Sequence, residues 1–380
     1  MKLLVFSPYY PPHIGGLESH AFEFNRHVAP LVERITVFTP QLPDSAPVRE
    51  TDGSIIILRF PAFEPIHNYP VPKFWRFGFW QLWREALASE PTHILSRTRF
   101  FFTSLMAWHI SRSRELPWLH VEHGSDFVHF HSSVKYCVGK LYDWTFGRFV
   151  LRRADQLVAN SLASARFVAK LSGRMDCETI YRGVEIDEIL STSEQSELHD
   201  RFPNRIIIGY LGRLIDGKGV IHILEAMHTL QDKRLACAII GSGPEKMRLE
   251  AYIKEHSLED SVILLGHRPL SEALGLMKSI DIFINPSYSE GIPTSVIEAA
   301  ILKKAIIATN VGGTPEIITG AGDGFLIPPD DTKVLAEKIN FFAGNAVARR
   351  GAGEAAYAKV KDKFSWNHSI EHYLSIITQK

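Results

Sequence analysis

Short β-rich runs alternate with segments of helical period along the whole chain, and the alternation falls into two series. The first series has its β-rich runs at 3–7, 35–39, 55–59, 93–96, 118–122 and 156–160. The second series has them at 205–211, 235–241, 262–266, 281–285, 304–309 and 324–327. Strands that alternate with helices form βαβ units around a mostly parallel sheet. The sequence therefore predicts an α/β protein with two doubly wound, Rossmann-like domains.

A polar segment marks the expected boundary between the two domains. Residues 191–197 consist only of Ser, Thr, Glu and Gln. At about 150 residues per domain, a chain of 380 residues accommodates two domains. We expect an N-terminal domain at 1–182, a C-terminal domain at 183–355 and a helical tail at 356–380 that packs back on the N-terminal domain.

Composition excludes several classes of protein. Lys+Arg and Asp+Glu both number 42, so the formal net charge is zero. A protein that wraps nucleic acid is usually clearly basic, and we expect no nucleic-acid partner. The cysteines, Cys137, Cys177 and Cys237, form no CxxC pair, which is typical of a reducing compartment.

The apolar runs are short. None reaches the roughly 18 residues of a membrane-spanning helix, and the run at the N-terminus is too short for a signal peptide. We expect a cytoplasmic protein, either free in solution or peripheral on the inner face of the cytoplasmic membrane.

Ligands of open α/β sheets bind beyond the carboxyl ends of the strands, so the loops after the strands hold the candidate sites. Gly15 and Gly16 lie between the first strand and a helical pattern that runs to about residue 29. Backbone N–H groups at such a helix start hold anions, helped by the helix dipole. A turn braced by the neighbouring prolines is the alternative.

A second glycine-rich loop begins at Gly212, after the first strand of the second series, and carries Arg213 and Lys218. Arginine offers a planar fork of donors and lysine a mobile point charge. Both suit a diphosphate that gains charge as it leaves, whereas an exposed basic loop is the alternative. The next strand ends in a tight turn that contains Gly243.

The stretch after the fourth strand of the second series is the most informative. Glu290 precedes an expected helix, Pro293 suits its first turn and Glu298 lies in its second turn. We expect the backbone N–H groups of Gly291 and Ile292 to point into the site. The two carboxylates are placed to accept hydrogen bonds from sugar or ribose hydroxyls.

The fifth strand of the first series ends at His123. Alternation places His120 and Glu122 on one face of that strand, and His123 at its end, where an imidazole can bond a ligand hydroxyl or phosphate. With His129 and His131 nearby, a metal site is the alternative, although the spacing is not H-E-x-x-H. We expect a structural His120, a ligand-facing His123 and no metal.

These motifs resemble the retaining glycosyltransferases of family GT4, which have the GT-B fold of two Rossmann-like domains facing a cleft. The resemblance covers nearly the whole chain and is most specific in the second domain. The motifs that carry it are Gly15-Gly16, the loop 212–219, the turn 241–244, Glu290 through Glu298, and Gly312-Gly313-x-Pro315-Glu316.

The resemblance implies an acceptor domain followed by a donor domain that binds a UDP- or GDP-linked sugar. Arg213 and Lys218 would bind the donor diphosphate, and His123 would face the donor sugar. Glu290 would bind that sugar with the backbone after it, and Glu298 would bind the ribose. The implied catalytic residues are His123, Arg213, Lys218 and Glu290. The implied donor-binding residues are Gly15, Gly16, Gly212, Gly243, Gly291, Ile292, Pro293 and Glu298.

The implied reaction is hexosyl transfer to a hydroxyl of a glycan or lipid-linked glycan, with retention of an α-linkage. GT-B enzymes need no metal, and the chain has no Asp-x-Asp motif of the metal-dependent alternative. The nucleotide sugar is a co-substrate, so no cofactor is expected. The sequence shows no convincing nucleophile, which is consistent with front-face displacement, where a donor phosphate oxygen takes the acceptor proton.

The chain departs from the family pattern at 181–187, where Asn-Gly-Val-Asp is usual, and at 96–99. The second segment reads Ser-Arg-Thr-Arg in place of His-rich motifs that help define the acceptor pocket. Two aromatic and basic segments, 74–84 and 135–153, suit an interfacial membrane contact and hence a lipid-linked acceptor, as in polysaccharide assembly. Packing between helices is the alternative for these aromatics.

Two other functions stay open, besides transfer to a soluble acceptor. A nucleotide-sugar epimerase with the GT-B fold needs extra catalytic carboxylates, and the Glu290 and Glu298 pair favours transfer. A non-catalytic nucleotide-sugar-binding protein would not need the full set of phosphate and sugar contacts.

Overall fold

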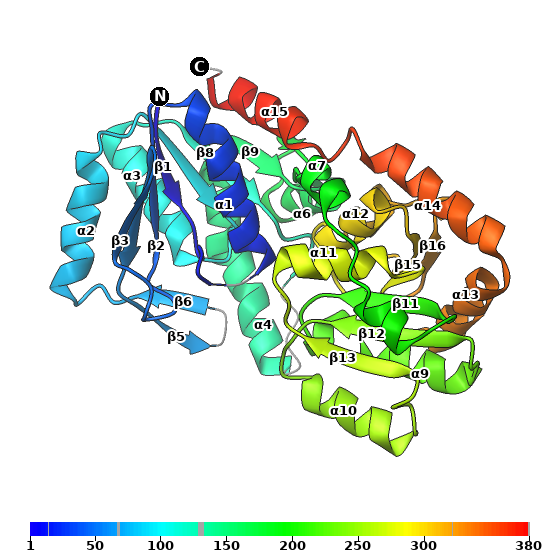
Figure 1. The fold of residues 1–380 in the computed structure, drawn as a ribbon. Helices are drawn as coiled ribbons and strands as arrows, with labels where there is room; N and C mark the ends of the chain where they lie inside the picture. The colour runs from blue at the N-terminus through cyan, green and yellow to red at the C-terminus, as the bar shows by residue number, and fades with distance from the viewer. Residues whose placement is uncertain (14, 67–68, 128–132, 321, 379–380) are drawn as a thin grey trace. The chain divides into compact units, whose positions relative to one another are not determined.

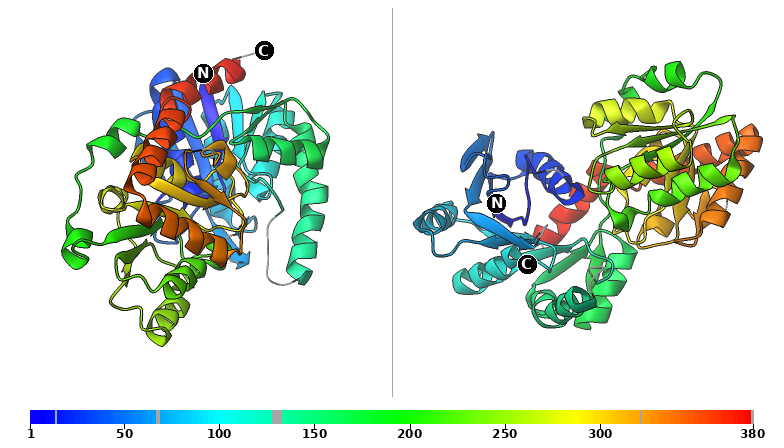
Figure 2. Two further views of the ribbon diagram at one scale, coloured as in Figure 1. Left: turned by 90° about the vertical axis from the view of Figure 1, so that its right-hand side faces the viewer. Right: turned by 90° about the horizontal axis from the view of Figure 1, so that it is seen from below.

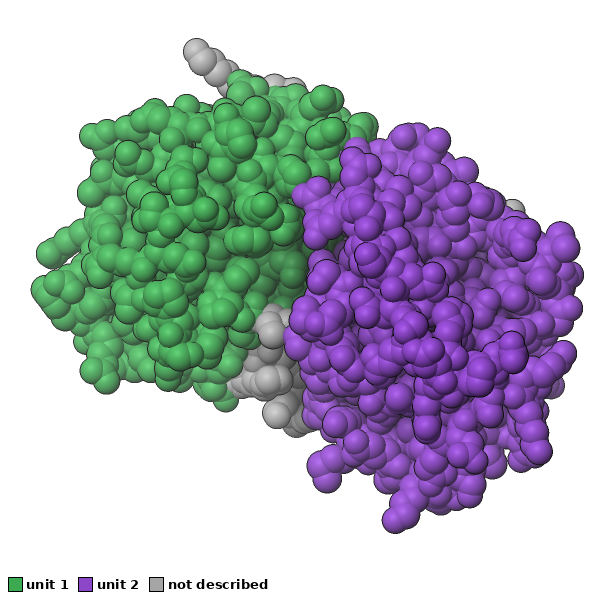
Figure 3. Space-filling view, in the orientation of Figure 1, with its two compact units in different colours: residues 1–182, 366–380 green, residues 183–365 purple. Residues whose placement is uncertain are grey.

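The computed structural model describes residues 1–13, 15–66, 69–127, 133–320 and 322–378. The chain divides into two compact units. Unit 1 comprises residues 1–182 and 366–380, and unit 2 comprises residues 183–365 (Figure 3). Each unit has its own sheet, and helices cover both faces of that sheet (Figures 1 and 2).

Unit 1 is built on an eight-stranded sheet in the order β10-β9-β8-β7-β1-β2-β4-β3. Its strands are β1 (Lys2–Phe6), β2 (Arg34–Pro40), β3 (Arg49–Asp52), β4 (Ile55–Phe60), β7 (His93–Arg97), β8 (Trp118–Glu122), β9 (Gln156–Ala159) and β10 (Cys177–Thr179). All neighbours are parallel except β3 and β4. A separate antiparallel pair is formed by β5 (Ala62–Ile66) and β6 (Tyr69–Pro72).

The helical elements of unit 1 are α1 (Gly16–Val28), η1 (Ala29–Leu31), α2 (Phe77–Ala88), α3 (Phe102–Arg114), α4 (Ser133–Tyr142), η2 (Asp143–Gly147), α5 (Arg148–Arg153), α6 (Leu162–Ser172) and α15 (Trp366–Thr378). Strand residues alternate between the two faces of a sheet. In β1, Leu3 and Val5 join the core that α1 and α15 cover, whereas Leu4 and Phe6 join the core that α2 and α3 cover. The C-terminal helix therefore completes the N-terminal unit.

Unit 2 is built on a six-stranded sheet, parallel throughout, in the order β13-β12-β11-β14-β15-β16. Its strands are β11 (Ile206–Leu211), β12 (Leu235–Ile240), β13 (Val262–Gly266), β14 (Ile282–Asn285), β15 (Ala305–Thr309) and β16 (Phe325–Ile327). Its helical elements are α7 (Ile186–Ser191), α8 (Glu197–Arg201), η3 (Asp216–Lys218), α9 (Ile221–Leu230), α10 (Lys246–Glu255), α11 (Leu270–Lys278), α12 (Thr294–Ile301), η4 (Thr314–Glu316), α13 (Thr332–Gly344) and α14 (Ala346–Val360).

The direction in which strands are added reverses beside β1 and beside β11. β1 pairs with β7 on one side and β2 on the other, and β11 pairs with β12 and β14. In doubly wound sheets, ligands bind outside the carboxyl ends of the strands at this reversal. The loops after β1 and β7 in unit 1, and after β11 and β14 in unit 2, are therefore the places where chemistry is expected.

The prediction of two Rossmann-like α/β domains with parallel sheets is confirmed, and every predicted β-rich run overlaps a strand. The strands β3, β5, β6 and β10 were not predicted. All residues of β3 are exposed, so its sequence shows no apolar alternation, and β10 is only three residues long. Among the described residues, no helix is both long and apolar enough to cross a membrane.

Candidate active site

Two loops at the reversal in unit 2 carry Lys218 and Glu290. Lys218 ends η3, shortly after β11, and Glu290 lies between β14 and α12. Lys218 Nζ is 2.6 Å from Glu290 Oε1. The Tyr288 N–H also donates to the Gly217 carbonyl at 3.0 Å, so the two loops are joined by backbone as well as by charge. Two side chains that were predicted separately thus form one ion pair.

The Glu290 carboxylate is held by further donors from the end of β14 and the loop after it. Ser287 Oγ lies 2.6 Å from Glu290 Oε1, and Asn285 Nδ2 lies 3.4 Å from the same oxygen. Both neighbours are buried. Sequence reasoning did not assign a role to Asn285 or Ser287, although both lie in the stretch that it singled out. Because these groups fix one carboxylate oxygen, Glu290 is oriented before any ligand arrives.

Glycine is required where the two loops meet. Gly219 has φ +60°, and a Cβ at this position would lie 2.4 Å from the Pro286 carbonyl oxygen. Other residues rarely adopt this φ, and the contact leaves no room for a side chain. Gly219 therefore permits the close approach that brings Lys218 to Glu290.

The loop after β14 leads into α12 as the sequence indicated, with a shift of one residue. Pro293 is the N-cap of α12, and the helix begins at Thr294. The Gly291 carbonyl accepts a hydrogen bond from the Gly313 N–H at 2.9 Å, and Ile292 is buried. Glu298 lies within α12 and is 8% exposed, so only a small part of its surface is open to solvent.

The loop after β11 also carries Arg213, which is exposed. The Arg213 carbonyl accepts a hydrogen bond from the Tyr210 hydroxyl at 3.0 Å, which anchors its backbone. Gly212 precedes it directly, and the Gly212 N–H donates to the carbonyl of Ile240 in β12 at 3.0 Å. Gly243 lies in the next loop, after β12. Backbone hydrogen bonds therefore anchor this loop, whereas the Arg213 side chain is exposed to solvent.

In unit 1, the loop after β1 leads to the start of α1. Gly15 is the N-cap and Gly16 the first residue of the helix. The Gly16 carbonyl accepts a hydrogen bond from the Arg182 guanidinium at 2.9 Å, and Glu18 of the first turn is paired with His13. Arg182 brings a positive charge to this helix start, where backbone N–H groups suit an anion, but the Glu18 carboxylate lies directly beside Gly15.

His123 follows β8 and is hydrogen-bonded inside unit 1. Its Nε2 lies 3.1 Å from His20 Nδ1, and its Nδ1 lies 3.4 Å from Thr98 Oγ1. Arg97 Nη1 also lies 3.1 Å from His20 Nδ1. Because a guanidinium can only donate, this nitrogen of His20 is an acceptor, and the proton of the His123–His20 hydrogen bond is on His123 Nε2.

Burial, together with the positive charge of Arg97, lowers the pKa of His123 to about 3. The same two causes hold the pKa of His20 well below its usual range. Both rings are therefore neutral at physiological pH. A neutral imidazole can form hydrogen bonds with a ligand but does not bring a cation to it.

The neighbouring histidines differ in what the structure says of them. His120 is fully buried, with Nδ1 2.8 Å from Ser96 Oγ. His129 and His131, which were weighed as metal ligands, lie outside the described residues.

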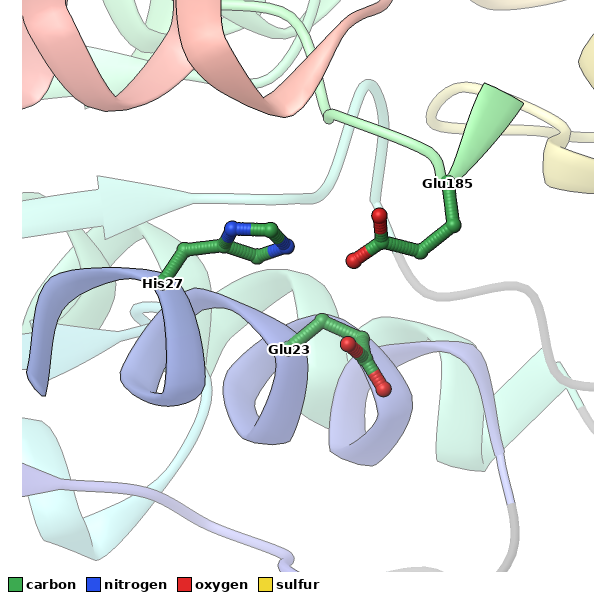
Figure 4. Close-up of side chains that lie close together, drawn as sticks. All are labelled: Glu23, His27 and Glu185. Atoms are coloured by element: carbon green, nitrogen blue, oxygen red, sulfur yellow. The ribbon is translucent and has the colours of Figure 1, made fainter. Parts of the chain in front are cut away.

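Glu23 and His27 lie one turn apart on α1 (Figure 4). Glu185, drawn with them, belongs to unit 2, and we infer no metal site from these residues.

A pocket of about 260 Å³ lies in unit 2 beside the same two loops. Its lining includes His222, whose Nε2 is 2.6 Å from the Tyr288 hydroxyl and whose Nδ1 is 2.8 Å from Glu225 Oε2. Of the described residues that line it, none belongs to the expected catalytic or donor-binding set. Motif reasoning missed His222, which lies in the first turn of α9, because it follows the glycine-rich loop that was singled out.

Comparison with known proteins covers both units. Residues 14–188 match the family described as Glycosyltransferase Family 4, and residues 191–359 match the family described as Glycosyl transferases group 1. The chain is 31% identical to an uncharacterized glycosyltransferase of Methanocaldococcus jannaschii, over 99% of this chain and 98% of that protein. It is 26% identical to the capsular polysaccharide biosynthesis glycosyltransferase CapM of Staphylococcus aureus, over 45% of each chain.

Solved structures agree on the fold. Sucrose-phosphate synthase from Thermosynechococcus elongatus superposes with a TM-score of 0.84 at 18% identity, covering 99% of this chain and 98% of that one. Anabaena HepE in complex with UDP superposes with a TM-score of 0.79 at 19% identity, covering 100% of both chains. At these identities the likeness concerns the fold alone.

We predict that the imidazole of His123 stays neutral between pH 8 and pH 5. With a pKa of about 3, only about one ring in a hundred is protonated at pH 5. Nitrogen-15 NMR of protein labelled at histidine measures this, with His123→Gln to assign the signal. Arg97→Gln, which removes the neighbouring charge, should move the midpoint upward. A midpoint near 6.5 in the unmodified protein would contradict this reading of the site.

Proposed function

The chain belongs to the family 4 glycosyltransferases and has the GT-B fold, and we propose that it transfers a sugar from a nucleotide-diphosphate sugar to a hydroxyl of a glycan or lipid-linked glycan. In this proposal the donor is UDP- or GDP-linked, and the reaction retains the α-configuration. The observation that carries the proposal is the ion pair of Lys218 and Glu290 at the reversal of the second sheet.

Unit 2 binds the donor in this proposal. Lys218 and Arg213 contact the diphosphate, because a mobile ammonium and a guanidinium on a strand-to-helix loop suit phosphate oxygens. Glu290 accepts hydrogen bonds from the sugar hydroxyls, and Glu298 accepts them from the ribose. The backbone N–H groups of Gly291 and Ile292, shortly before the start of α12, add donors without added charge. A neighbour of the same fold, HepE, was crystallised with UDP and with UDP-glucose, which supports a donor of this class.

The pairing of Lys218 with Glu290 gives the two residues a joint role. Without a donor, each neutralises the other, so neither charge is left alone in a partly buried site. When the diphosphate binds, its negatively charged oxygens join Glu290 in contact with the Lys218 ammonium. The ion pair then places the phosphate-binding cation beside the sugar-binding carboxylate. The two groups together span the bond that breaks.

The proposed chemistry needs no covalent intermediate with the protein. The bond from the anomeric carbon to the diphosphate breaks, and the acceptor oxygen bonds to the same face of that carbon. The acceptor proton passes to the departing phosphate oxygen. Arg213 and Lys218 stabilise the charge that the diphosphate gains, which is the electrostatic part of catalysis. His123 is neutral and its Nε2 donates to His20, so in this proposal its Nδ1 accepts a hydrogen bond from a hydroxyl of the donor sugar in place of the 3.4 Å contact with Thr98 Oγ1.

We predict that Arg213→Ala and Lys218→Ala each lower kcat/KM by about 100-fold or more, since each removes a group that stabilises leaving-group charge. A panel of labelled UDP- and GDP-sugars with a bacterial lipid extract as acceptor supplies the assay. Lys254→Ala, at an exposed position of α10, is the control. Near-native turnover in both variants would remove the phosphate assignment. An epimerised donor without transfer would replace the proposed reaction with epimerisation.

We further predict that activity survives EDTA, because the cationic loop supplies the charge that a divalent ion would otherwise bring to the diphosphate. The measurement compares initial rates with and without chelator, and a metal-dependent glycosyltransferase serves as the positive control. Complete loss of activity that Mn²⁺ or Mg²⁺ restores would contradict the metal-independent mechanism.

Unit 1 carries the acceptor in this proposal, and its aromatic segments divide between core and surface. Phe79 and Leu82 are buried, whereas Trp75 and Phe77 are each 69% exposed and Trp80 is 45% exposed. The alternative of helix packing therefore holds for the inward face of α2. Large aromatics that face solvent beside the exposed Arg76 and Arg84 suit a membrane interface.

A chain of ring contacts connects this segment to the second aromatic segment. Phe74 contacts Phe102 at 6.4 Å between ring centroids, Phe102 contacts Tyr69 at 6.4 Å, and Tyr69 contacts Tyr142 at 6.2 Å. Tyr142 contacts Phe146 of η2 at 5.3 Å. Exposed side chains near that end include Leu141, Trp144 and Phe146, with the basic Lys140 alongside. The continuity supports one aromatic and basic docking surface for a lipid-linked acceptor.

We predict reversible binding to anionic liposomes that weakens as salt rises, since each basic residue near such a surface contributes roughly 1 kcal/mol. Co-sedimentation measures it. Replacing Trp75 and Phe77 by Ser and Arg76 by Gln should reduce binding while nucleotide binding is kept, because all three are exposed. Replacing the exposed residues Leu31 and Val48 of unit 1 is the matched control. Protein that stays in the supernatant at low salt would favour a soluble acceptor.

A further inference from the structure

Arg99 is a fully buried arginine of unit 1 whose guanidinium is shared by two buried carboxylates. Its Nε lies 3.0 Å from Asp143 Oδ1 and its Nη2 3.0 Å from Asp143 Oδ2, which is a two-pronged contact. Its Nη1 lies 3.0 Å from Glu122 Oε1. The three side chains are at most 2% exposed. The segment 96–99 was noted in the sequence only as a departure from the family pattern, and the proposed function gives Arg99 no role.

Glu122 connects this arginine to the loop that carries His123. Glu122 Oε1 accepts hydrogen bonds from the backbone N–H groups of His123 at 2.9 Å and Gly124 at 2.7 Å. Its other oxygen accepts one from the backbone N–H of Arg99 at 3.1 Å. One carboxylate therefore ties the end of β7 to the end of β8. Burial alone would raise the pKa of Glu122, but the charge of Arg99 holds it well below its usual range, so the carboxylate stays ionised.

The backbone makes room for Arg99 beside this loop. A Cβ at Gly124 would lie 2.7 Å from Arg99 Nη1 and 3.2 Å from Glu122 Oε1. Arg99 Nη2 also donates to the Asp126 carbonyl at 3.1 Å. The guanidinium thus contacts the segment that contains His123 through Glu122 and the Asp126 carbonyl. It occupies the room that Gly124 leaves beside this segment.

A cluster of buried charges costs desolvation that an apolar side chain would avoid, and breaking one pair leaves an uncompensated charge. Stability alone gives little reason to place a guanidinium here. The hydrogen bonds of Glu122 with two consecutive N–H groups define the direction in which the chain leaves β8. His123 is the first residue after that strand, so its ring position depends on this direction.

We propose that Arg99 is a positioning residue for glycosyl transfer, which fixes Glu122 and through it the backbone of residues 123–124, so that His123 is held in its place beside His20. The inference rests on the proposed role of His123 toward the donor sugar. It assigns to Arg99 no contact with substrate. Asp143, which begins η2, supplies the second anchor of the guanidinium.

A double-mutant cycle tests whether Arg99 acts through His123. Arg99→Lys keeps the charge but loses the fork of donors, and we expect it to lower kcat about tenfold with little change in the KM of the donor. His123→Ala should lower kcat further, and adding Arg99→Lys to His123→Ala should have no further effect. Equal effects of Arg99→Lys in both backgrounds would overturn the proposal. The proposal would also be overturned if Arg99→Lys lowered kcat while His123→Ala left kcat unchanged.

Amide hydrogen exchange supplies a readout that does not depend on activity. Arg99→Lys should accelerate exchange at His123 and Gly124 at least tenfold, whereas the amides of β1 keep their protection. Unchanged exchange at these two amides would overturn the proposal even if activity fell. If the unmodified protein transferred no sugar to any acceptor, the proposed function would fail, and exchange would still decide whether Arg99 holds the loop.

Two further variants guard against a general loss of folding. Arg112→Lys, at an exposed ion pair with Asp155 in the same unit, is the matched control and should leave rates and exchange unchanged. If Arg99→Lys does not fold, Asp143→Asn weakens the other anchor while it leaves the contact of Arg99 with Glu122. It should shift exchange at residues 123–124 in the same direction and by a smaller factor, and no shift would count against the proposal.

Discussion

The contact between Lys218 and Glu290 is the interaction on which the rest of the candidate site depends. It joins two loops that follow neighbouring strands, β11 and β14, at the reversal of the second sheet. The 2.6 Å separation requires the close backbone approach at Gly219 and the hydrogen bonds that hold Glu290. An ion pair at this place keeps a cation and a carboxylate in register before a ligand arrives. Preorganised charge of this kind is the main means by which proteins stabilise a leaving group.

Unit 1 uses charge in a different way. Arg97 lies beside His20 and His123, and its positive charge, added to burial, keeps both rings neutral. Arg99, two residues further on, is instead paired with Glu122 and Asp143. Burial and the charge of the first arginine together keep the histidines neutral, and the second arginine ties down the loop that carries one of them. The same end of β7 therefore supplies both electrostatic tuning and geometry.

Much of the fold could be predicted from the sequence, because strands buried on both faces of a parallel sheet are apolar runs. β3 was missed because its residues are exposed, and β5 with β6 because they form a small pair outside the main sheets. The candidate residues lie after strands, where the rule for open sheets places them. Which of them touch could not be predicted. Lys218 and Glu290 are 72 residues apart, and Arg99 and Asp143 are 44 apart, so only the order of strands and the path of the helices brings them together.

The aromatic segment 74–84 shows the limit of composition as a guide. Aromatic residues three or four positions apart share one face of a helix, but the sequence does not say which face meets the core. The structure places Phe79 inside and Phe77 and Trp80 outside, and the solvent-facing set is the part that bears on a membrane surface.

Binding of nucleotides is the measurement that tests the central claim most directly. Calorimetry should show that UDP or GDP binds the unmodified protein at least tenfold more tightly than Lys218→Met, while the matching nucleoside binds both equally. Equal affinity of the diphosphate for both proteins would contradict the claim that this ion pair receives the donor.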